Sequence, residues 1–458
     1  MRIERDALGQ MELPDEAYYG IQTMRAADNF AVSGVTCSKY TEYITSLVGI
    51  KKAAALAHGD MDLLSKDVVR AIVSACDEIM GGALLDEFIV DVIQGGGSTS
   101  TNQNANEVIA NRANEILTGK KGNDKVRPND HVNLGQSTND VIFTALKIGI
   151  YRAFENLIKE SERLSKTMRD KQSEFKDVVK LGRTCMQDAL PTTLGHEFGG
   201  FASMIERQTE KLRVVRKEFL SLPLGATAVG TGLCAFEGYD EGVYEHMRQI
   251  FGADFYQDSD LFDGIQNADV YVSASGGLKS LAVGLGKIAA DFRMLSSGPQ
   301  TGLCEITLPA VQPGSTCMPR KINPVMPELM VQISWQVCGN DTAVTMAAQG
   351  GELDCNVWEP IFIKNIFDSM GLLTKGIALF NDKCVKGIQA NADVCKKNAE
   401  QGYGLPMVLS SVFGYQAGLE AGLDMFDENE QRLLTDSSVL ADKKQNRKMT
   451  LDMRRKRS

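Results

Sequence analysis

The segment 314–324 brings together a glycine, two adjacent hydroxyls, a lysine and an Asn-Pro pair, residue types that could activate a hydroxyl and hold a carboxylate. Asn323 is a good N-cap and Pro324 a good first helical residue, so the pattern predicts a helix that begins here. The N-terminus of such a helix carries partial positive charge, and Lys321 adds a full one. In that field the Ser315 hydroxyl would lose its proton more readily, and a substrate carboxylate would be held. The simpler interpretation is a polar loop that only precedes a helix.

Three further segments are rich in hydroxyl and amide side chains: 99–107, 131–140 and 182–189. Asn104 and Glu107 have the spacing of a capping box, which predicts a helix N-terminus near them. We expect the other two segments to lie at helix N-termini as well. Each segment alone is most often a helix cap, but several such N-termini together could bind a small dianion.

Composition limits the class of protein. The chain has 458 residues, of which 43% are hydrophobic and 24% charged, as is ordinary for a globular protein with a large core. A net charge of −10 argues against nucleic acid as a partner, and no apolar run is long enough to span a bilayer. The charged N-terminus lacks the apolar stretch of a signal peptide, and the ten cysteines contain no Cys-x-x-Cys pair. We therefore expect a protein of the reducing cytoplasm, without a membrane partner.

No metal or cofactor is expected from the motifs. The four histidines are too few and too far apart for a metal cluster. The glycine-rich run 225–232 does not match a dinucleotide-binding fingerprint, and no strand–helix unit is evident around it.

Helical periodicity dominates the chain. One apolar stripe alternates spacings of three and four residues and predicts a long helix: Leu278, Leu281, Leu285, Ile288, Phe292 and Leu295. Four glycines in the same stretch indicate close approach between helices. Further long helices are predicted around 146–168, 197–220 and 324–348, and helices of this length favour a bundle.

These patterns suggest a division into three parts. We expect a mixed helical domain at 1–138, a central helical-bundle domain at 139–393 and a small C-terminal helical domain at 394–458. The basic tail, 443–457, is expected to be a solvated and frayed end.

The four polar segments resemble motifs of the aspartase/fumarase superfamily, in the order expected for it. Segment 314–324 is similar to the signature loop, and Cys185 in segment 182–189 stands where relatives have histidine or glutamine. The resemblance runs from residue 3 to about residue 375. It implies an all-α, three-domain fold with a central bundle of long helices. It also implies a homotetramer in which each active site draws segments from three subunits.

Within the superfamily the chain looks most like an aspartase. After Pro324 it continues Val-Met-Pro-Glu, as aspartases do. Fumarases use a histidine at position 185, paired with the glutamate that matches Glu328, to handle water, and cysteine is poorly suited to that role. The resemblance therefore implies reversible deamination of L-aspartate to fumarate and ammonia. It implies no cofactor, because the carboxylate of the small dicarboxylate substrate accepts the electrons itself.

The resemblance also assigns roles to individual residues. Ser315 is the implied general base. The implied substrate-binding residues are Thr101, Ser137 and Thr138 with the loop residues Thr316 and Met318 for the β-carboxylate, Thr184, Lys321 and Asn323 for the α-carboxylate, and Asn139 with Thr101 for the amino group, near which Cys185 would lie.

Some residues depart from the superfamily pattern. Cys185, Gln300, Cys304 and Cys317 replace residues that are usual near the site. Three alternatives therefore stay open: another carbon–nitrogen lyase that releases fumarate from a substituted aspartate, a fumarase, and a non-catalytic structural relative. Retention of Ser315 and its polar companions argues against the last.

Overall fold

The computed structural model describes residues 1–402, 404–416, 428–434 and 436–456. Helices make up most of these residues, and the strands among them form only two-stranded pairs. The expected all-α class is therefore confirmed. Within the described residues, none of the helices is both long and apolar enough to cross a membrane.

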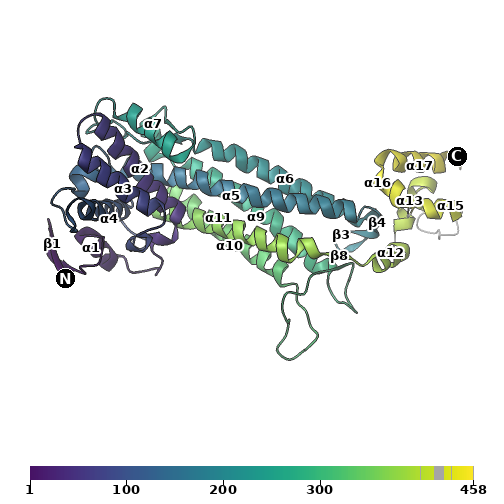
Figure 1. Cartoon of the computed structure of the whole chain (residues 1–458). Helices are drawn as coiled ribbons and strands as arrows, with labels where there is room; N and C mark the ends of the chain where they lie inside the picture. Colours follow the sequence, from purple (N-terminus) through teal and green to yellow (C-terminus); the bar gives the residue numbers. More distant parts are fainter. Residues whose placement is uncertain (403, 417–427, 435, 457–458) are drawn as a thin grey trace. The chain divides into compact units, whose positions relative to one another are not determined.

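Figure 1 labels most of these elements. The helices are α1 Ile21–Asn29, α2 Thr41–Asp60, α3 Lys66–Met80, α4 Thr99–Thr118, α5 Thr138–Glu174, α6 Leu194–Glu218, α7 Tyr239–Phe251, α8 Leu261–Gln266, α9 Asp269–Leu295, α10 Val325–Gln349, α11 Glu359–Lys383, α12 Ala392–Gln401, α13 Gly404–Phe413, α15 Glu428–Leu434, α16 Ser437–Ala441 and α17 Lys443–Arg455. The short turns are η1 Cys37–Lys39, η2 Leu85–Glu87, η3 Pro128–Val132 and η4 Val385–Gly387. The strands pair as β1 Arg2–Asp6 with β2 Gly9–Leu13, β3 Val179–Thr184 with β4 Gln187–Thr193, β5 Ser221–Leu222 with β6 Tyr256–Gln257, and β7 Ile306–Thr307 with β8 Gln389–Ala390.

The chain forms two compact units. The first comprises 1–157, 211–279 and 336–371, and the second comprises 158–210, 280–335 and 372–458. The boundaries between the units fall inside the five long helices α5, α6, α9, α10 and α11. The three-part division at residues 138 and 393 stays a prediction, and its last part includes 403, 417–427, 435 and 457–458, which lie outside the described residues.

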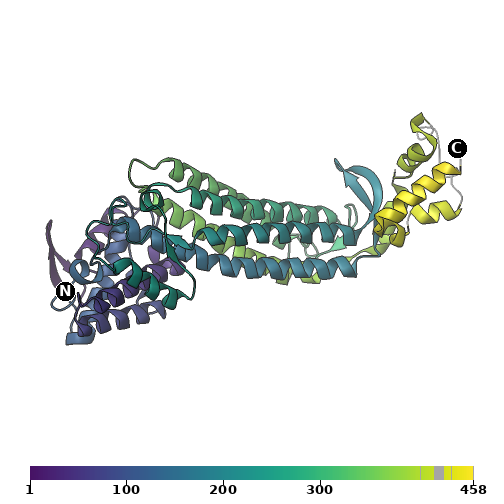
Figure 2. The ribbon, with the colours of Figure 1, turned by 90° about the horizontal axis from the view of Figure 1, so that it is seen from above.

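In the first unit, α3 packs against both α2 and α4 (Figure 1), and Figure 2 shows the purple N-terminal helices from above. Tyr271 of α9 stacks on Phe362 of α11, with ring centroids 4.9 Å apart. Gly149 of α5 is needed where helices meet, because a Cβ there would lie 2.9 Å from the Phe367 ring. Large aromatic side chains and one close glycine contact thus build this core.

In the second unit, α5 runs beside α6, and an ion pair of 2.6 Å joins Arg169 to Glu206. The apolar stripe predicted for α9 is buried along its whole length. A Cβ on Gly284 would lie 2.4 Å from the Met204 sulfur, and one on Gly286 would lie 2.7 Å from the Ser334 hydroxyl. These two glycines confirm the predicted close approach between helices.

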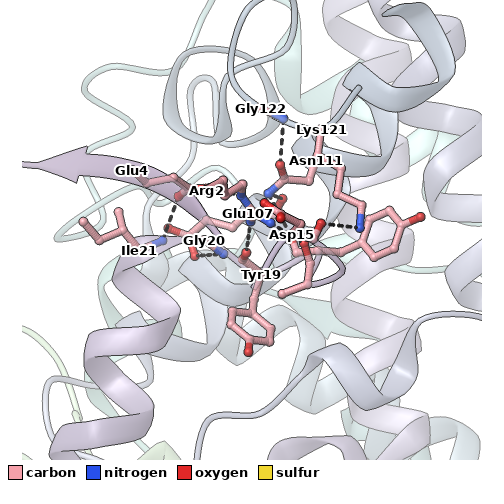
Figure 3. A network of polar contacts seen from close by, with 12 residues as sticks. Arg2, Glu4, Asp15, Tyr19, Gly20, Ile21, Glu107, Asn111, Lys121 and Gly122 are labelled. Carbon is pink, nitrogen blue, oxygen red and sulfur yellow. Dashed lines mark hydrogen bonds and ion pairs between the residues drawn. The ribbon is translucent and has the colours of Figure 1, made fainter. Parts of the chain in front are cut away.

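The capping box predicted at Asn104 and Glu107 is wrong. Helix α4 already begins at Thr99, so both residues lie inside it. The buried Glu107 carboxylate instead accepts hydrogen bonds from the backbone N–H groups of Gly20, Gln22 and Thr23, at 2.8–3.1 Å. Figure 3 shows Glu107 facing Gly20. The side chain therefore caps α1, which is distant in sequence and invisible to a local spacing rule.

The C-terminal tail is not frayed over its described part. Residues Lys443–Arg455 form α17, capped by the Asp442 side chain through bonds to the N–H groups of the next turn. Met453 is buried in a small apolar cluster with Val412 and Leu434. Met449 of the same helix packs against this cluster, so two apolar side chains among many basic ones dock the helix. Arg457 lies outside the described residues.

Candidate active site

The loop 314–323 in the second unit is closed by its own polar contacts. Gly314 N–H donates to the Lys321 carbonyl at 2.8 Å, and the Asn323 side-chain amide donates to the Gly314 carbonyl at 2.8 Å. A Cβ on Gly314 would lie 2.6 Å from the Lys321 carbonyl oxygen. Glycine is therefore required here for space.

The Ser315 hydroxyl lies at the centre of this loop. Its Oγ accepts hydrogen bonds from the backbone N–H groups of Cys317, at 3.2 Å, and Met318, at 3.0 Å. Two donated N–H bonds stabilise negative charge on the oxygen that receives them. Ser315 is half-buried, whereas Thr316, Met318 and Lys321 are exposed. The loop thus holds a hydroxyl supported by two N–H groups and also carries an exposed lysine.

The predicted capping role of Asn323 is wrong. Helix α10 begins at Val325, and the first helical bond runs from Glu328 N–H to the Pro324 carbonyl. The Asn323 amide is used to close the loop instead of accepting from the helix. The helix still starts directly after the loop, so its partial positive charge remains next to Lys321.

The segment 182–189 is not a helix N-terminus, contrary to expectation. It forms the tip of the antiparallel hairpin β3–β4, where Thr184 pairs with Gln187. Cys185 and Met186 make the two-residue turn with φ of 53° and 60°. Two successive positive φ angles are typical of the type I′ turn that matches strand twist. Thr184 and Cys185 are both exposed at this tip.

A buried carboxylate anchors the hairpin. Glu305 receives two hydrogen bonds from the Arg183 guanidinium, at 3.0 and 2.8 Å, and lies 3.2 Å from Lys180 Nζ. Burial opposes its ionisation, but the Arg183 hydrogen bonds and the Lys180 charge still hold the pKa of Glu305 below its usual range. Residues adjacent to Thr184 are thereby fixed by charge-assisted bonds.

In the first unit, Thr101 lies at the start of α4 and is fully buried. The Gln94 side-chain amide donates to the Thr101 hydroxyl at 2.8 Å, and its carbonyl accepts from the Thr101 N–H at 3.2 Å. The chain reaches this helix through Gly96, Gly97 and Ser98, which all have positive φ. This sharp turn places the first turn of α4 against Gln94.

Ser137 precedes α5, Thr138 and Asn139 are its first two residues, and all three are half-buried. The Asp140 carboxylate accepts from Ser137 N–H at 3.0 Å and from the backbone N–H groups of Gly225 and Thr227 at 3.2 and 3.0 Å. Burial raises the pKa of Asp140 to about 7, against the effect of these bonds. The Asn139 amide donates to the Ala228 carbonyl at 2.7 Å. The glycine-rich run 225–232 thus supports the predicted substrate-binding residues.

Comparison with known proteins identifies the family. A lyase family model matches residues 9–339. The chain belongs to the lyase family. The aspartate ammonia-lyase of a Bacillus species is 43% identical over 427 residues, covering 93% of this chain and 91% of that protein. That of Bacillus subtilis (strain 168) is 44% identical over 417 residues, covering 91% and 87%. The crystal structure of fumarate lyase:delta crystallin from Brucella melitensis bound to cobalt has a TM-score of 0.88 at 41% identity, covering 99% of each chain.

The lyase fold brings some of the predicted residues together. In the first unit the Asn102 amide, next to Thr101, donates to the Thr138 hydroxyl at 3.1 Å and so links the N-termini of α4 and α5. In the second unit the loop contacts join Ser315, Met318 and Lys321. Among the described residues, no hydrogen bond joins the 182–189 hairpin to the 314–323 loop.

Several supporting residues of this lyase were missed from the sequence. Three of them were not singled out because amide side chains are common in ordinary loops and helix caps: Gln94, Asn102 and Asn133. Lys51, which is fully buried in α2, was not recognised from the sequence as a supporting residue. The available signal was a lysine that directly follows the apolar run 47–50, because a buried lysine requires a partner. In the described part of the chain, no group of three or more histidine, cysteine or acidic residues is placed to hold a metal ion.

Proposed function

We propose that the chain is an aspartate ammonia-lyase that converts L-aspartate reversibly to fumarate and ammonia. The observation that carries the proposal is the Ser315 hydroxyl, which receives two backbone N–H bonds in a loop followed directly by a helix. The similarity to aspartate ammonia-lyases over more than nine-tenths of the chain supports the same reaction.

In the proposed reaction, the Ser315 alkoxide removes a proton from the carbon beside the β-carboxylate. The electron pair moves into that carboxylate and gives a doubly charged enediolate. The pair then returns to form the double bond as the C–N bond breaks and ammonia leaves. Hydrogen bonds that strengthen as charge develops on the carboxylate lower the barrier most. No cofactor is required, since the substrate itself stores the electrons.

The binding groups follow from the resemblance to the superfamily. Thr101, Ser137 and Thr138, with the loop backbone at Thr316 and Met318, would donate to the β-carboxylate. Lys321, Asn323 and Thr184 would hold the α-carboxylate, and Asn139 with Thr101 would meet the amino group, near which Cys185 would lie. The exposure of Lys321 supports this role, because a free ammonium can reach an anion that enters from solvent.

A homotetramer with shared sites is part of the proposal. Four glycines, one on each of α6, α9, α10 and α11, have open space where a Cβ would lie: Gly200, Gly276, Gly339 and Gly371. Helix glycines cost about 1 kcal/mol each relative to alanine, so they need a reason. Large apolar side chains, among them Trp335 and Met346, are exposed on α10. Both features favour helices of another copy packing closely here. A mass four times that of the 50.0 kDa chain in light scattering is the expected result. A cytoplasmic location stays a prediction from the sequence.

The proposal is tested by incubating the purified protein with L-aspartate and following the ultraviolet absorbance of fumarate. The reverse reaction with fumarate and a panel of amines identifies the amine. Fumarate formation from aspartate together with ammonia release is expected. Hydration of fumarate to malate without amination would instead establish a fumarase, and inertness in both directions would leave a structural relative.

A second candidate is a lyase that releases fumarate from a substituted aspartate. It is favoured by Cys185, which is exposed at the hairpin tip and offers a smaller, less polar side chain than histidine or glutamine. Addition of a larger amine to fumarate at a higher kcat/KM than that of ammonia would select this candidate.

A further inference from the structure

The side-chain carbonyl of Asn133, in the first unit, is the centre of a buried polar network. Its Oδ1 accepts three hydrogen bonds, from Lys51 Nζ at 2.8 Å and from the amides of Asn102 and Asn106 at 3.1 and 3.2 Å. Its own amide donates to the Gln136 carbonyl at 3.0 Å. These contacts connect α2 and α4 to the segment before α5.

The lysine decides the direction of every bond in this network. A charged ammonium group can only donate, so the Asn133 atom that faces Lys51 must be the carbonyl oxygen. The Asn102 atom that faces this oxygen must then be its amide nitrogen. Amide orientations that are otherwise ambiguous are fixed here by a group with only one hydrogen-bonding role.

The fixed hydrogen-bond directions extend from Asn133 through Asn102 to Thr138, a predicted substrate-binding residue. The Asn102 amide also donates to the Thr138 hydroxyl oxygen at 3.1 Å. Because that oxygen accepts, the hydroxyl hydrogen of Thr138 is left to point to another acceptor. A hydroxyl constrained in this way is a donor toward a carboxylate.

We propose that Lys51 is a positioning residue, which acts through Asn133 and Asn102 to hold the Thr138 hydroxyl as a hydrogen-bond donor to the substrate β-carboxylate. The proposal rests on the proposed function, because it concerns the same site. Lys51 itself does not touch the substrate.

The burial of Lys51 explains why this arrangement depends on its charge. Burial lowers the pKa of Lys51 to about 7, while the Asp140 carboxylate and the Cys76 thiol, which face it from α5 and α3, act in the opposite direction. A neutral amine can accept as well as donate, so loss of the proton releases the fixed direction. The Thr138 hydroxyl would then be free to turn its oxygen toward the substrate.

The experiment measures binding of succinate, a dicarboxylate without an amino group, to five proteins by calorimetry. These are the wild type, Lys51→Met, Asn102→Ala and the double variant, with Lys52→Met as the matched control. Lys52 is the next residue and carries the same charge, but it pairs with Asp77 away from the network. We expect Lys51→Met and Asn102→Ala each to weaken binding by about tenfold or more, and Lys52→Met to bind as the wild type does.

The double variant separates positioning from a general structural effect. If Lys51 acts through Asn102, the double variant should bind no worse than the weaker single variant. If the losses of affinity in the two single variants multiply in the double variant, or if Lys51→Met and Lys52→Met bind succinate equally well, the proposal is overturned.

If Lys51→Met does not fold, the pH dependence of succinate binding provides the test. Wild-type binding should then weaken from pH 6 to pH 8.5, whereas Asn102→Ala should show a flatter profile; equal profiles would overturn it. A wild type that neither binds succinate nor converts aspartate would count against the proposed function instead.

Discussion

The loop 314–323 and the network around Asn133 place polar groups by opposite means. In the loop, backbone groups hold the Ser315 hydroxyl, while the charged side chain of Lys321 is exposed. Around Asn133, side chains hold side chains, and Lys51 is fully buried. Backbone contacts survive most substitutions, whereas a buried side-chain network fails when one member changes.

The difference between the two regions separates residues that take part in the reaction from residues that support the fold. Loop side chains contribute little to folding, so replacing them should change rates and leave stability almost unchanged. Ionisable groups buried in the first unit cost free energy to keep, so replacing them should change stability as well.

Ser315→Ala should produce the largest effect. Loss of a general base lowers the rate by about 10²–10⁴-fold, and the fold should stay intact because a loop hydroxyl contributes little. Initial rates of fumarate formation and the thermal midpoint measure both. Ser173→Ala, which removes an exposed helix hydroxyl from the same unit, is the control. If Ser315→Ala kept more than a tenth of the wild-type rate, Ser315 would not be the base.

Lys321→Met should have the next largest effect. Losing a charge-assisted contact to the α-carboxylate should cost on the order of 2–4 kcal/mol of transition-state binding, seen as a higher KM and a lower kcat. Arg320→Met makes the same charge change one residue earlier and should be nearly silent. Equal kinetics of the two variants would mean that Lys321 points away from the substrate.

Much of the bundle could be predicted because its signal is local. The α9 stripe follows helical spacing, and every residue of it is buried. Polar residues cluster near the starts of α4, α5 and α10, so the segments that hold Thr101, Thr138 and Ser315 could be recognised from the sequence. The roles of these three residues come from the resemblance to the superfamily and stay predictions.

What could not be predicted depends on partners distant in sequence. Glu107 has capping-box spacing but caps α1, because Gly20 lies beside it only in the folded chain. Segment 182–189 reads as a polar cap, yet its ends pair as strands. Lys51 gained its role from Asn133, which is 82 residues away. Rules based on the spacing of residues along the chain cannot detect contacts between residues that are distant in sequence.

Glu359→Gln should change stability with pH and have little effect on rate. Both carboxylate oxygens of Glu359 are buried without a partner in the described structure, and burial raises the pKa of Glu359 to about 8 from its ordinary value of 4.5. Between these values the folded chain holds a proton that the unfolded chain has lost. The wild type should therefore lose up to about 1.4 kcal/mol per pH unit from this group as pH rises through that window.

Thermal midpoints at pH 5.5, 6.5, 7.5 and 8.5 measure this effect. The advantage of Glu359→Gln over the wild type should grow with pH and level off above pH 8. Glu352→Gln, the same change on an exposed side chain, should follow the wild type. Parallel curves for all three proteins would show that Glu359 is ionised in the folded state at neutral pH.

Cys185→His should change stability least, and its effect on which substrate the enzyme uses should be the most informative. Position 185 has a φ of 53°, a region that histidine adopts more readily than most residues, and the hairpin is anchored separately through Arg183 and Glu305. The thermal midpoint should therefore change little. If the wild type is an aspartase that tolerates cysteine, histidine should supply a polar partner for the amino group and leave ammonia release equal or higher.

If Cys185 instead makes room for a larger amine, histidine should fill that room. The native reaction would then fall while aspartate deamination rises, because the polar ring gains a partner only in the smaller substrate. Ammonia release from aspartate, measured for both proteins beside amine addition to fumarate, decides between the two. A wild type inactive on aspartate, next to a histidine variant that becomes active, would replace the aspartase assignment by a lyase for a substituted aspartate. That result would also mean that the exposed β3–β4 hairpin, rather than the buried network around Asn133, determines which amine the enzyme accepts.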